Sequence, residues 1–351
     1  MPTLENDRLV FRFPQIEEHA NFSINFQRTL RIPDTEATYS LPPGLGSFPV
    51  RHAEDFSASL PPETSSRGGV ILPMWQAEAM WIGFSNSGPD WDLDFPVAIK
   101  VAAGKINAVT GEPWRPRLHR RPQDYMVSPQ QPWLDGFAVE KGVIRQFVAM
   151  PLGDGYSVEE QITGEAEWGG LQISVTPLKT EIWKEKREAW ERERERRPSR
   201  VVFADQSVMF SKSRSMASMA LGAGGKMRQE IYPDRFKIGD WDVDATDRVF
   251  VTLVHARDWK SVTGEAAPNE PPTAKEYSKA GLPWFEYYGI DQSVLSGSAA
   301  LAGVKSVAKM FEKLTGATMP NSSDIETKTP TAIGPSAPQA RKVRTKGSWD
   351  S

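Results

Sequence analysis

The 351-residue sequence contains no cysteine, which excludes disulfide bonds, thiolate nucleophiles and cysteine ligands for metals. It also lacks any run of about eighteen apolar residues, the length that a transmembrane helix needs. The N-terminus carries neither the basic nor the apolar segment of a secretory signal peptide. A formal net charge of −3 gives no general attraction to nucleic acid. We therefore expect a soluble, cytoplasmic protein without a transmembrane segment or a nucleic-acid partner.

Histidine is scarce as well, and none of the four histidines pairs with another at the spacing of zinc ligands. His255 follows the apolar run Val249–Val254 and stands beside Arg257 and Asp258, which makes it the best candidate for a general base. The alternative is a structural role, which is more common for a histidine at the end of a strand. No complete catalytic motif accompanies it, so the sequence does not decide whether the protein is an enzyme.

Two glycine motifs predict backbone geometry rather than chemistry. Thr-Gly-Glu occurs three times, and Gly111, Gly164 and Gly264 are suited to the positive φ of a tight turn. The segment Leu221–Met227 (LGAGGKM) lacks the residues that a phosphate loop or a dinucleotide fingerprint requires. We expect it to mark a place where two backbones cross closely.

Two stretches of the chain, 150 positions apart, are nearly identical. Asp90–Asp94 has the sequence DWDLD, and Asp240–Asp244 has the sequence DWDVD. In each copy an alternating apolar run follows, then Val-Thr-Gly-Glu and a Pro-Trp pair. An internal repeat predicts a duplicated architecture, but it does not specify a chemistry.

The aspartates of the repeat are candidate metal ligands. In an extended segment alternate residues share a face, so three carboxylates would line one edge of each copy, with the tryptophan on the reverse side. Such an edge is suited to Ca²⁺, which is the one candidate cofactor, although the spacing does not match an EF-hand. The alternative is that the aspartates bend the chain into a turn before a buried strand. The candidate ligands are Asp90, Asp92, Asp94, Asp240, Asp242 and Asp244.

Short apolar runs separated by glycine and proline predict a mainly β fold. We expect two related modules of sandwich or barrel type, residues 45–178 and 200–290, packed as a pseudo-twofold pair. Residues 1–44 are expected to form an irregular N-terminal arm, with the alternative that part of it adds a strand to a sheet.

Three other segments differ in composition from the β-rich regions. Residues 179–199 are mostly charged and predict a connector helix with two tryptophans on one face. Residues 291–316 carry apolar side chains at helical spacing and predict an amphipathic helix. Residues 317–351 have almost no large apolar side chains and predict a disordered tail.

Tryptophan and arginine supply the candidate binding residues. The sequence has twelve tryptophans, whose role is either packing in the β core or service as platforms for a sugar or peptide. The chain after the first Val-Thr-Gly-Glu forms a basic loop, residues 115–121, with four arginines and a histidine. This loop is suited to a phosphate or an acidic partner, the alternative being a solvated loop. The candidates are Trp91, Trp133, Trp241, Trp284, Arg117 and Arg120.

Several longer phrases are distinctive, among them AIKVAAGKINAVTGE at 98–112, QPWLDG at 131–136 and RQFVAMPLGDGY at 145–156. Across roughly residues 45–315 the chain resembles a fungal and bacterial family whose members are often labelled integral membrane proteins. The resemblance implies no settled activity and no catalytic residues. The membrane label does not match this sequence, which contains no spanning segment.

We therefore predict a non-enzymatic binding or assembly protein whose Trp- and Asp-rich loops hold a glycan or a protein partner. The alternative is a hydrolase acting on a polymer such as a carbohydrate, with carboxylates from the Asp triplets and His255 near the cleft. A homo-oligomer is a further candidate assembly.

Overall fold

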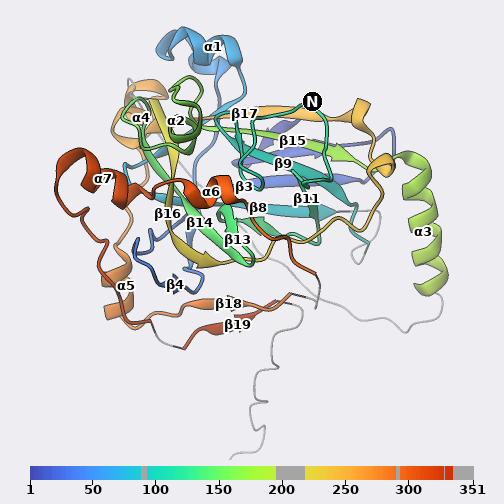
Figure 1. Ribbon diagram of the computed structural model, residues 1–351. Helices are drawn as coiled ribbons and strands as arrows, with labels where there is room; N and C mark the ends of the chain where they lie inside the picture. Colours follow the sequence, from blue (N-terminus) through green and yellow to red (C-terminus); the bar gives the residue numbers. More distant parts are fainter. Residues whose placement is uncertain (88–92, 195–217, 290–292, 328, 335–351) are drawn as a thin grey trace, which may run out of the picture.

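The apolar runs of the sequence form strands, and the fold is mainly β, as predicted. The computed structural model describes residues 1–87, 93–194, 218–289, 293–327 and 329–334 (Figure 1). A second, small sheet pairs β18 (Phe285–Tyr287) with β19 (Thr331–Ile333). The strands of the large sheet are β1 (Thr3–Glu5), β2 (Arg8–Arg12), β3 (Asn21–Thr29), β4 (Thr38–Tyr39), β5 (Gly44–Ser47), β6 (Arg51–His52), β7 (Val70–Met74), β8 (Ala79–Ser87), β9 (Val97–Ala103), β10 (Ile106–Asn107), β11 (Met126–Ser128), β12 (Trp133–Leu134), β13 (Gly136–Glu140), β14 (Val143–Pro151), β15 (Leu171–Pro177), β16 (Ser218–Arg228) and β17 (Asp247–His255).

The main strands follow one another through the large sheet in the order β2, β3, β8, β14, β16, β17, β15, β9 and β11. Each of these neighbours is antiparallel, whereas β7 beside β17 and β4 beside β16 are parallel. Short helices surround the sheet, with α3 on one side of it and α7 on the other (Figure 1). The helices and 3-10 turns are η1 (Glu54–Ser59), α1 (Pro62–Arg67), α2 (Val158–Thr163), α3 (Thr180–Arg194), η2 (Ile238–Asp240), η3 (Val243–Ala245), α4 (Ala256–Val262), α5 (Ala274–Lys279), α6 (Ala299–Gly303) and α7 (Val307–Thr315).

The structure does not keep apart the two segments that were expected to form separate modules. β14 and β15, from residues 45–178, pair directly with β16 and β17, from residues 200–290. The two apolar runs that follow the repeated phrase are β9 and β17, and they flank β15 on its two sides. Ile173 of β15 lies opposite Val101 on one side and Val249 on the other. The two apolar runs therefore belong to one sheet and run in the same direction.

The N-terminal segment is not an irregular arm, as was expected, but part of the sheet. β3 pairs with β8 over its full length, from Asn21 opposite Ser87 to Thr29 opposite Ala79. Its side chains alternate between buried and half-exposed for most of the strand, as a strand with one face on the core requires. This alternation was present in the sequence, but the turn residues around it concealed the strand.

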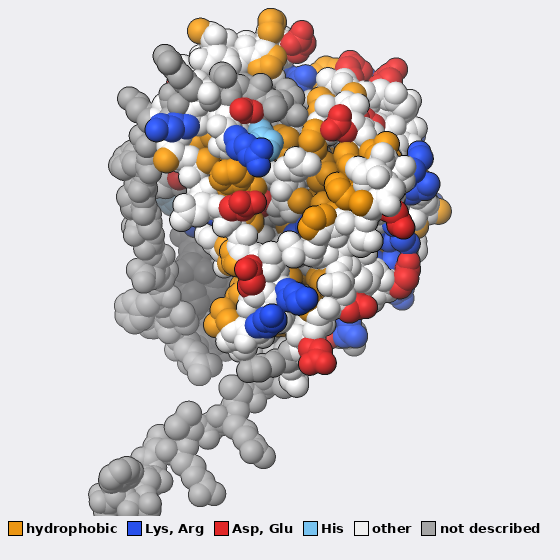
Figure 2. Space-filling view, turned by 90° about the vertical axis from the view of Figure 1, so that its left-hand side faces the viewer, with side chains coloured by type: hydrophobic (Ala, Val, Ile, Leu, Met, Phe, Trp, Pro, Cys, Tyr) orange, Lys and Arg blue, Asp and Glu red, His pale blue; other side chains and the backbone are white. Residues whose placement is uncertain are grey.

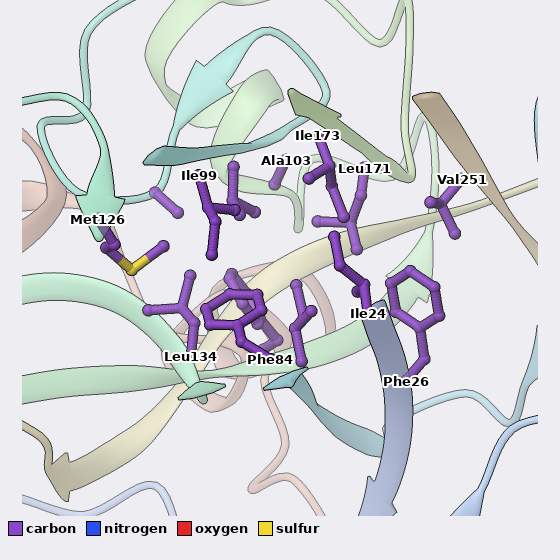
Figure 3. Packing of buried hydrophobic residues seen from close by; sticks show 14 of the residues in the cluster. Ile24, Phe26, Phe84, Ile99, Ala103, Met126, Leu134, Leu171, Ile173 and Val251 are labelled. Carbon is purple, nitrogen blue, oxygen red and sulfur yellow. The ribbon is translucent and has the colours of Figure 1, made fainter. Parts of the chain in front are cut away.

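The main core lies between side chains from the two ends of the strand order. Ile24 of β3 and Phe84 of β8 face Ile99 of β9 and Ile173 of β15 (Figure 3). Three of these four side chains are fully buried, and Phe84 is nearly so. Packing of these apolar faces against one another is the main source of stability for such a sheet.

The glycine-rich segment is the strand β16, and its glycines allow other parts of the chain to approach closely, as predicted. A Cβ atom at Gly225 would lie 2.3 Å from the carbonyl oxygen of Pro33. A Cβ atom at Gly222 would lie 2.7 Å from a methyl carbon of Val307. Backbone and side chains thus pack directly on the strand, which explains the glycines without a nucleotide.

The recurring Thr-Gly-Glu tripeptide forms a turn at each of its three positions. Gly111, Gly164 and Gly264 have φ angles of 69°, 78° and 77°, in the left-handed region that glycine adopts without strain. Gly164 is the C-cap of α2, and Gly264 follows the end of α4. The tripeptide is therefore a turn element and not a repeated active site.

The charged segment contains helix α3, and both of its tryptophans contact the body of the protein. Trp183 is fully buried, and its ring lies edge-on to Phe95 with a centroid distance of 4.9 Å. Trp190 packs against the main core while remaining partly exposed. The charged side chains occupy the rest of the helix surface, as expected for a helix that covers the side of a sheet.

The single C-terminal helix that was expected is divided into two short helices, α6 and α7. Ser298 and Ser306 each accept a hydrogen bond from a backbone N–H one turn later, so each begins a helix of its own. Gly316 ends α7 in the left-handed conformation. Figure 2 views the side of the molecule that carries α7, where patches of hydrophobic side chains lie among scattered acidic and basic ones.

The beginning of the expected disordered tail is part of the folded structure. Asp324 accepts hydrogen bonds from the hydroxyls of Tyr39 (2.7 Å) and Thr35 (2.8 Å), and Met319 is buried. Farther along, β19 completes the small sheet with β18. This segment gains order from partners far away in the sequence, which its own composition does not reveal. Residues 335–351 lie outside the described residues.

Replacing Gly225 by alanine is expected to lower the free energy of unfolding by about 1–3 kcal/mol or more, because a methyl group there collides with the backbone at Pro33. Gly303→Ala is the matched control, since nothing lies within 4 Å of its Cβ position and alanine favours the helix that it ends. Urea denaturation of both variants checks this. Equal stability of the two would contradict the close packing of β16.

Candidate ligand-binding site

The second Asp-Trp-Asp copy forms two successive 3-10 turns and is not extended. The carboxylate of Asp240 accepts a hydrogen bond from the backbone N–H of Lys237 (2.8 Å), and that of Asp242 from the N–H of Ala245 (3.3 Å). The copy also bonds through its backbone to the chain at the end of β15, where the N–H of Asp242 donates to the carbonyl of Pro177. These aspartates stabilise turns, which agrees with the alternative interpretation of the repeat.

The aspartates of the first copy lie only partly within the described structure. Asp90, Trp91 and Asp92 fall outside the described residues, and Asp94 is exposed. Among the residues that the structure does describe, no three His, Asp or Glu side chains come together as ligands for a metal ion. The carboxylate edge expected for Ca²⁺ is thus not formed by the second copy, where Asp240 and Asp242 accept hydrogen bonds within their own turns.

Trp241 of the second copy is fully buried and packs in a hydrophobic cluster. Its indole N–H donates to the carboxylate of Asp234 (3.0 Å), and the hydroxyl of Tyr125 donates to the same oxygen (2.6 Å). Arg120 donates to the backbone carbonyls of Asp234 (2.8 Å) and Phe236. These side chains, which are buried except for Arg120, form a network that holds the segment before η2 against the body.

The basic loop after the first Val-Thr-Gly-Glu is held by a fully buried lysine, which sequence reasoning did not identify. Lys100 of β9 donates to the carboxylate of Asp124 (2.6 Å) and to the backbone carbonyls of Arg115 (2.9 Å) and Arg117. Burial lowers the pKa of Lys100. The Arg117 side chain is exposed, while the loop beneath it is fixed by the ion pair.

His255, the candidate general base, caps helix α4. Its Nδ1 accepts a hydrogen bond from the backbone N–H of Arg257 (3.1 Å), and its ring lies edge-on to Trp75. Burial lowers the pKa of His255, which favours the neutral ring that this acceptor role needs. It does not line the pockets described below.

A pocket of about 450 Å³, here called the aromatic pocket, lies between β18, β12 and the end of β16. It collects aromatic rings from three distant parts of the chain, together with charged and amide side chains. The aromatic residues are Trp133, Tyr232, Phe285, Tyr287 and Tyr288, and the polar ones include Gln131, Arg228, Gln229, Glu230 and Glu286.

Two of these rings meet at a right angle. The centroids of Trp133 and Tyr287 are 4.6 Å apart, with an angle of 88° between the ring planes. The indole N–H of Trp133 donates to the carboxylate of Asp135, and the backbone N–H of Asp135 donates to the side-chain oxygen of Gln229 (2.9 Å). Asp135 is buried, so the orientation of the Trp133 ring is fixed from inside the protein.

The charged side chains of the aromatic pocket are paired with its tyrosines. The hydroxyl of Tyr232 donates to Glu230 (3.1 Å), and that of Tyr288 donates to Glu286 (3.0 Å). Arg228 forms an ion pair with Glu286 at 2.5 Å. The pocket therefore offers hydrogen-bond acceptors and donors beside aromatic faces.

A second pocket of about 520 Å³, here called the polar pocket, adjoins the aromatic pocket. Both are lined by Gly142 and Gln229, next to the turn between β13 and β14. Arg120, Arg121 and Glu140 are among the charged residues of the polar pocket. The two pockets are therefore neighbours, and we refer to them together as the groove.

Of the predicted binding residues, Trp133 lines the aromatic pocket and Arg120 lines the polar pocket. Trp284, the counterpart of Trp133 in the repeat, is fully buried beside the same site and packs edge-on to Tyr277. The tyrosines of the pocket were missed, although the adjacent pair at 287 and 288 follows a Pro-Trp pair closely.

Within the described residues, no helix has both the length and the apolar character required to cross a membrane. Comparisons with protein-family models, with curated proteins and with solved structures found no match. The function must therefore be argued from the geometry of the sites.

The buried carboxyl group behind Trp133 predicts a specific pH dependence. Burial raises the pKa of Asp135 to about 7, whereas an unfolded aspartate titrates near pH 3.9. The folded state then holds a proton that the unfolded state has lost, so this group lowers the free energy of unfolding as pH rises from about 4 to 7. The slope is at most about 1.4 kcal/mol per pH unit.

Asp135→Asn keeps an acceptor for Trp133 but does not titrate. We expect its stability relative to the unmodified protein to increase with pH across this window, as measured by urea denaturation at each pH. Asp154→Asn, at an exposed position, is the control and should follow the unmodified protein. If the free energy of unfolding changed with pH in the same way for Asp135→Asn and the unmodified protein, the raised pKa would be contradicted.

Proposed function

We propose that the protein is a non-enzymatic binding protein whose ligand is a carbohydrate held in the aromatic pocket. The observation that carries the proposal is the perpendicular pair of Trp133 and Tyr287, set among carboxylate, guanidinium and amide groups. The apolar C–H face of a sugar ring packs well on an aromatic face, while its hydroxyls need donors and acceptors at the edge.

The groups at the edge of the pocket suit sugar hydroxyls. Glu230 and Glu286 supply acceptors, and Arg228 supplies donors in a fixed planar arrangement. Each carboxylate is already positioned by a tyrosine hydroxyl. Because a positioned side chain loses little freedom on binding, the cost of ordering the site is small.

The second pocket beside the first favours an oligosaccharide over a single sugar. The polar pocket shares Gly142 and Gln229 with the aromatic pocket, and its lining has no aromatic residue but several hydrogen-bonding groups. A chain bound with one sugar on Trp133 would extend into it towards Arg120.

Trp133→Ala is expected to weaken binding of a glycan identified on an array by about 2 kcal/mol, or roughly 30-fold, because it removes the aromatic face on which the sugar would pack. Trp133→Phe retains an aromatic ring, so its affinity for the glycan should fall less. Trp190→Ala, which removes a partly exposed tryptophan of α3, is the control and should bind normally. Calorimetry measures the affinities, and circular dichroism verifies the fold.

Absence of any glycan ligand on the array, or equal affinity of Trp133→Ala and the control, would overturn the proposal. Capture of a peptide through the same aromatic residues would replace the glycan by a protein partner.

One observation favours the hydrolase alternative, namely that two carboxylates, Glu230 and Glu286, line the same pocket. Glycoside hydrolysis uses such a pair, one as acid and one as base or nucleophile. His255 and those aspartates of the repeat that the structure describes, which were the earlier candidates for this role, do not line the groove.

Under the binding proposal, the unmodified protein releases no product from the glycan over many hours. Under the hydrolase alternative it does, and both Glu230→Gln and Glu286→Gln abolish product release while the glycan still binds. Chromatography of the glycan after incubation distinguishes the two functions.

A further inference from the structure

A third pocket, which shares no lining residue with the groove, lies between the basic loop, β15 and the start of β17. It has a volume of about 320 Å³, and we call it the donor pocket. The lining residues that matter here are Trp114, Arg117, Ser174, Thr176, Asp244 and Arg248.

Two polar groups of the donor pocket have no hydrogen-bond partner. The hydroxyl oxygen of Ser174 and the indole nitrogen of Trp114 are among the five buried side-chain N or O atoms that are unpaired within the described residues. Ser174 is only 2% exposed. A buried polar group without a partner is costly and rare in a folded protein, so two beside one pocket point to a ligand that accepts from them.

A further hydroxyl hydrogen is free at the same place. The hydroxyl oxygens of Thr176 and Thr246 are 2.8 Å apart and form a hydrogen bond, and both residues line the pocket. In such a pair one hydroxyl donates and the other accepts, so the accepting group still has its own hydrogen to donate.

The pocket also carries positive charge. Arg248 lies over the rings of Phe250 (4.5 Å) and Trp114 (5.1 Å), which hold its guanidinium in place. Neither Arg248 nor Arg117 forms an ion pair within the part of the chain that the structure describes. Asp244 is the one carboxylate among the lining residues, so two positive charges face a single negative one.

We propose that the donor pocket binds a small oxyanion of the phosphate class, either free or as the monoester of a larger ligand. Its lining supplies two guanidinium groups, two hydroxyl hydrogens and an indole N–H, and such a set complements an anion that only accepts hydrogen bonds. The Trp114 ring beside these donors provides an apolar surface for the organic part of an ester.

Calorimetry of the full chain at low salt, with inorganic phosphate and with phenyl phosphate, tests the proposal. We expect saturable binding that is weakened about tenfold or more by Arg248→Gln and by Arg117→Gln, each of which removes a charge-assisted hydrogen bond. Lys313→Gln is the control, because it removes one exposed positive charge from α7, on the side of the molecule away from α3 (Figure 1). Tighter binding of phenyl phosphate identifies an ester as the ligand class, and equal affinities identify the free anion.

Ser174→Ala separates binding from folding. It removes an unpaired hydroxyl, so the melting temperature should stay equal or rise, while the affinity for phosphate falls. The proposal is overturned if neither ligand binds saturably, or if both arginine variants bind as the unmodified protein does. It is also overturned if Ser174→Ala lowers the melting temperature and leaves the affinity unchanged, because the hydroxyl would then have a structural role.

Discussion

Close packing along β16 is the constraint on which the rest of the structure depends. This strand pairs with β14 over most of its length and with β17 at its start, so it joins the two ends of the strand order that face each other in the core. Glycines at positions 222, 224 and 225 leave no space between it and its neighbours. The chain continues after the strand into Gln229 and Glu230, which line the aromatic pocket. The position of the site is thus determined by the same packing that closes the core.

The two kinds of site differ in how their polar groups are satisfied. In the aromatic pocket each charged group already has a partner, such as Tyr232 for Glu230, and the rings are oriented by a buried acid. In the donor pocket the hydroxyl of Ser174 and the indole of Trp114 have none. The aromatic pocket therefore favours a ligand recognised by its shape and its neutral hydroxyls. The donor pocket favours a ligand that supplies hydrogen-bond acceptors.

Local patterns in the sequence predicted four of the main strands, but neither β3 nor β16. The apolar runs at 98–101, 144–149, 171–175 and 249–254 all lie within strands, and the turn glycines have the expected backbone angles. The pairing of those strands could not be predicted, because partners such as β14 and β16 are separated by a long segment. The duplication itself stays a prediction, since the echoed runs share a sheet but the turns that precede them are described for only one copy.

The candidate site was predictable only in part, for the same reason. Trp133 was identified from the repeat, but Tyr232 and Tyr287 belong to the pocket only because β18 lies beside β12 and the end of β16. Lys100 was assigned to a strand, yet nothing in one sequence indicates that a lysine is completely buried. Its partner, Asp124, lies on the far side of the loop that the ion pair holds.

The parallel placement of β9 and β17 on the two sides of β15 has a mechanical consequence for helix α3. The segments that enter these two strands arrive at the same edge of the sheet, where β15 leaves it and α3 begins. Trp183 of the helix rests on Phe95 from one segment, while Trp241 of the other forms a bridge with Leu178, just before the helix. The start of α3 is therefore held between the two segments that lead into β9 and β17, which anchors the helix from both sides.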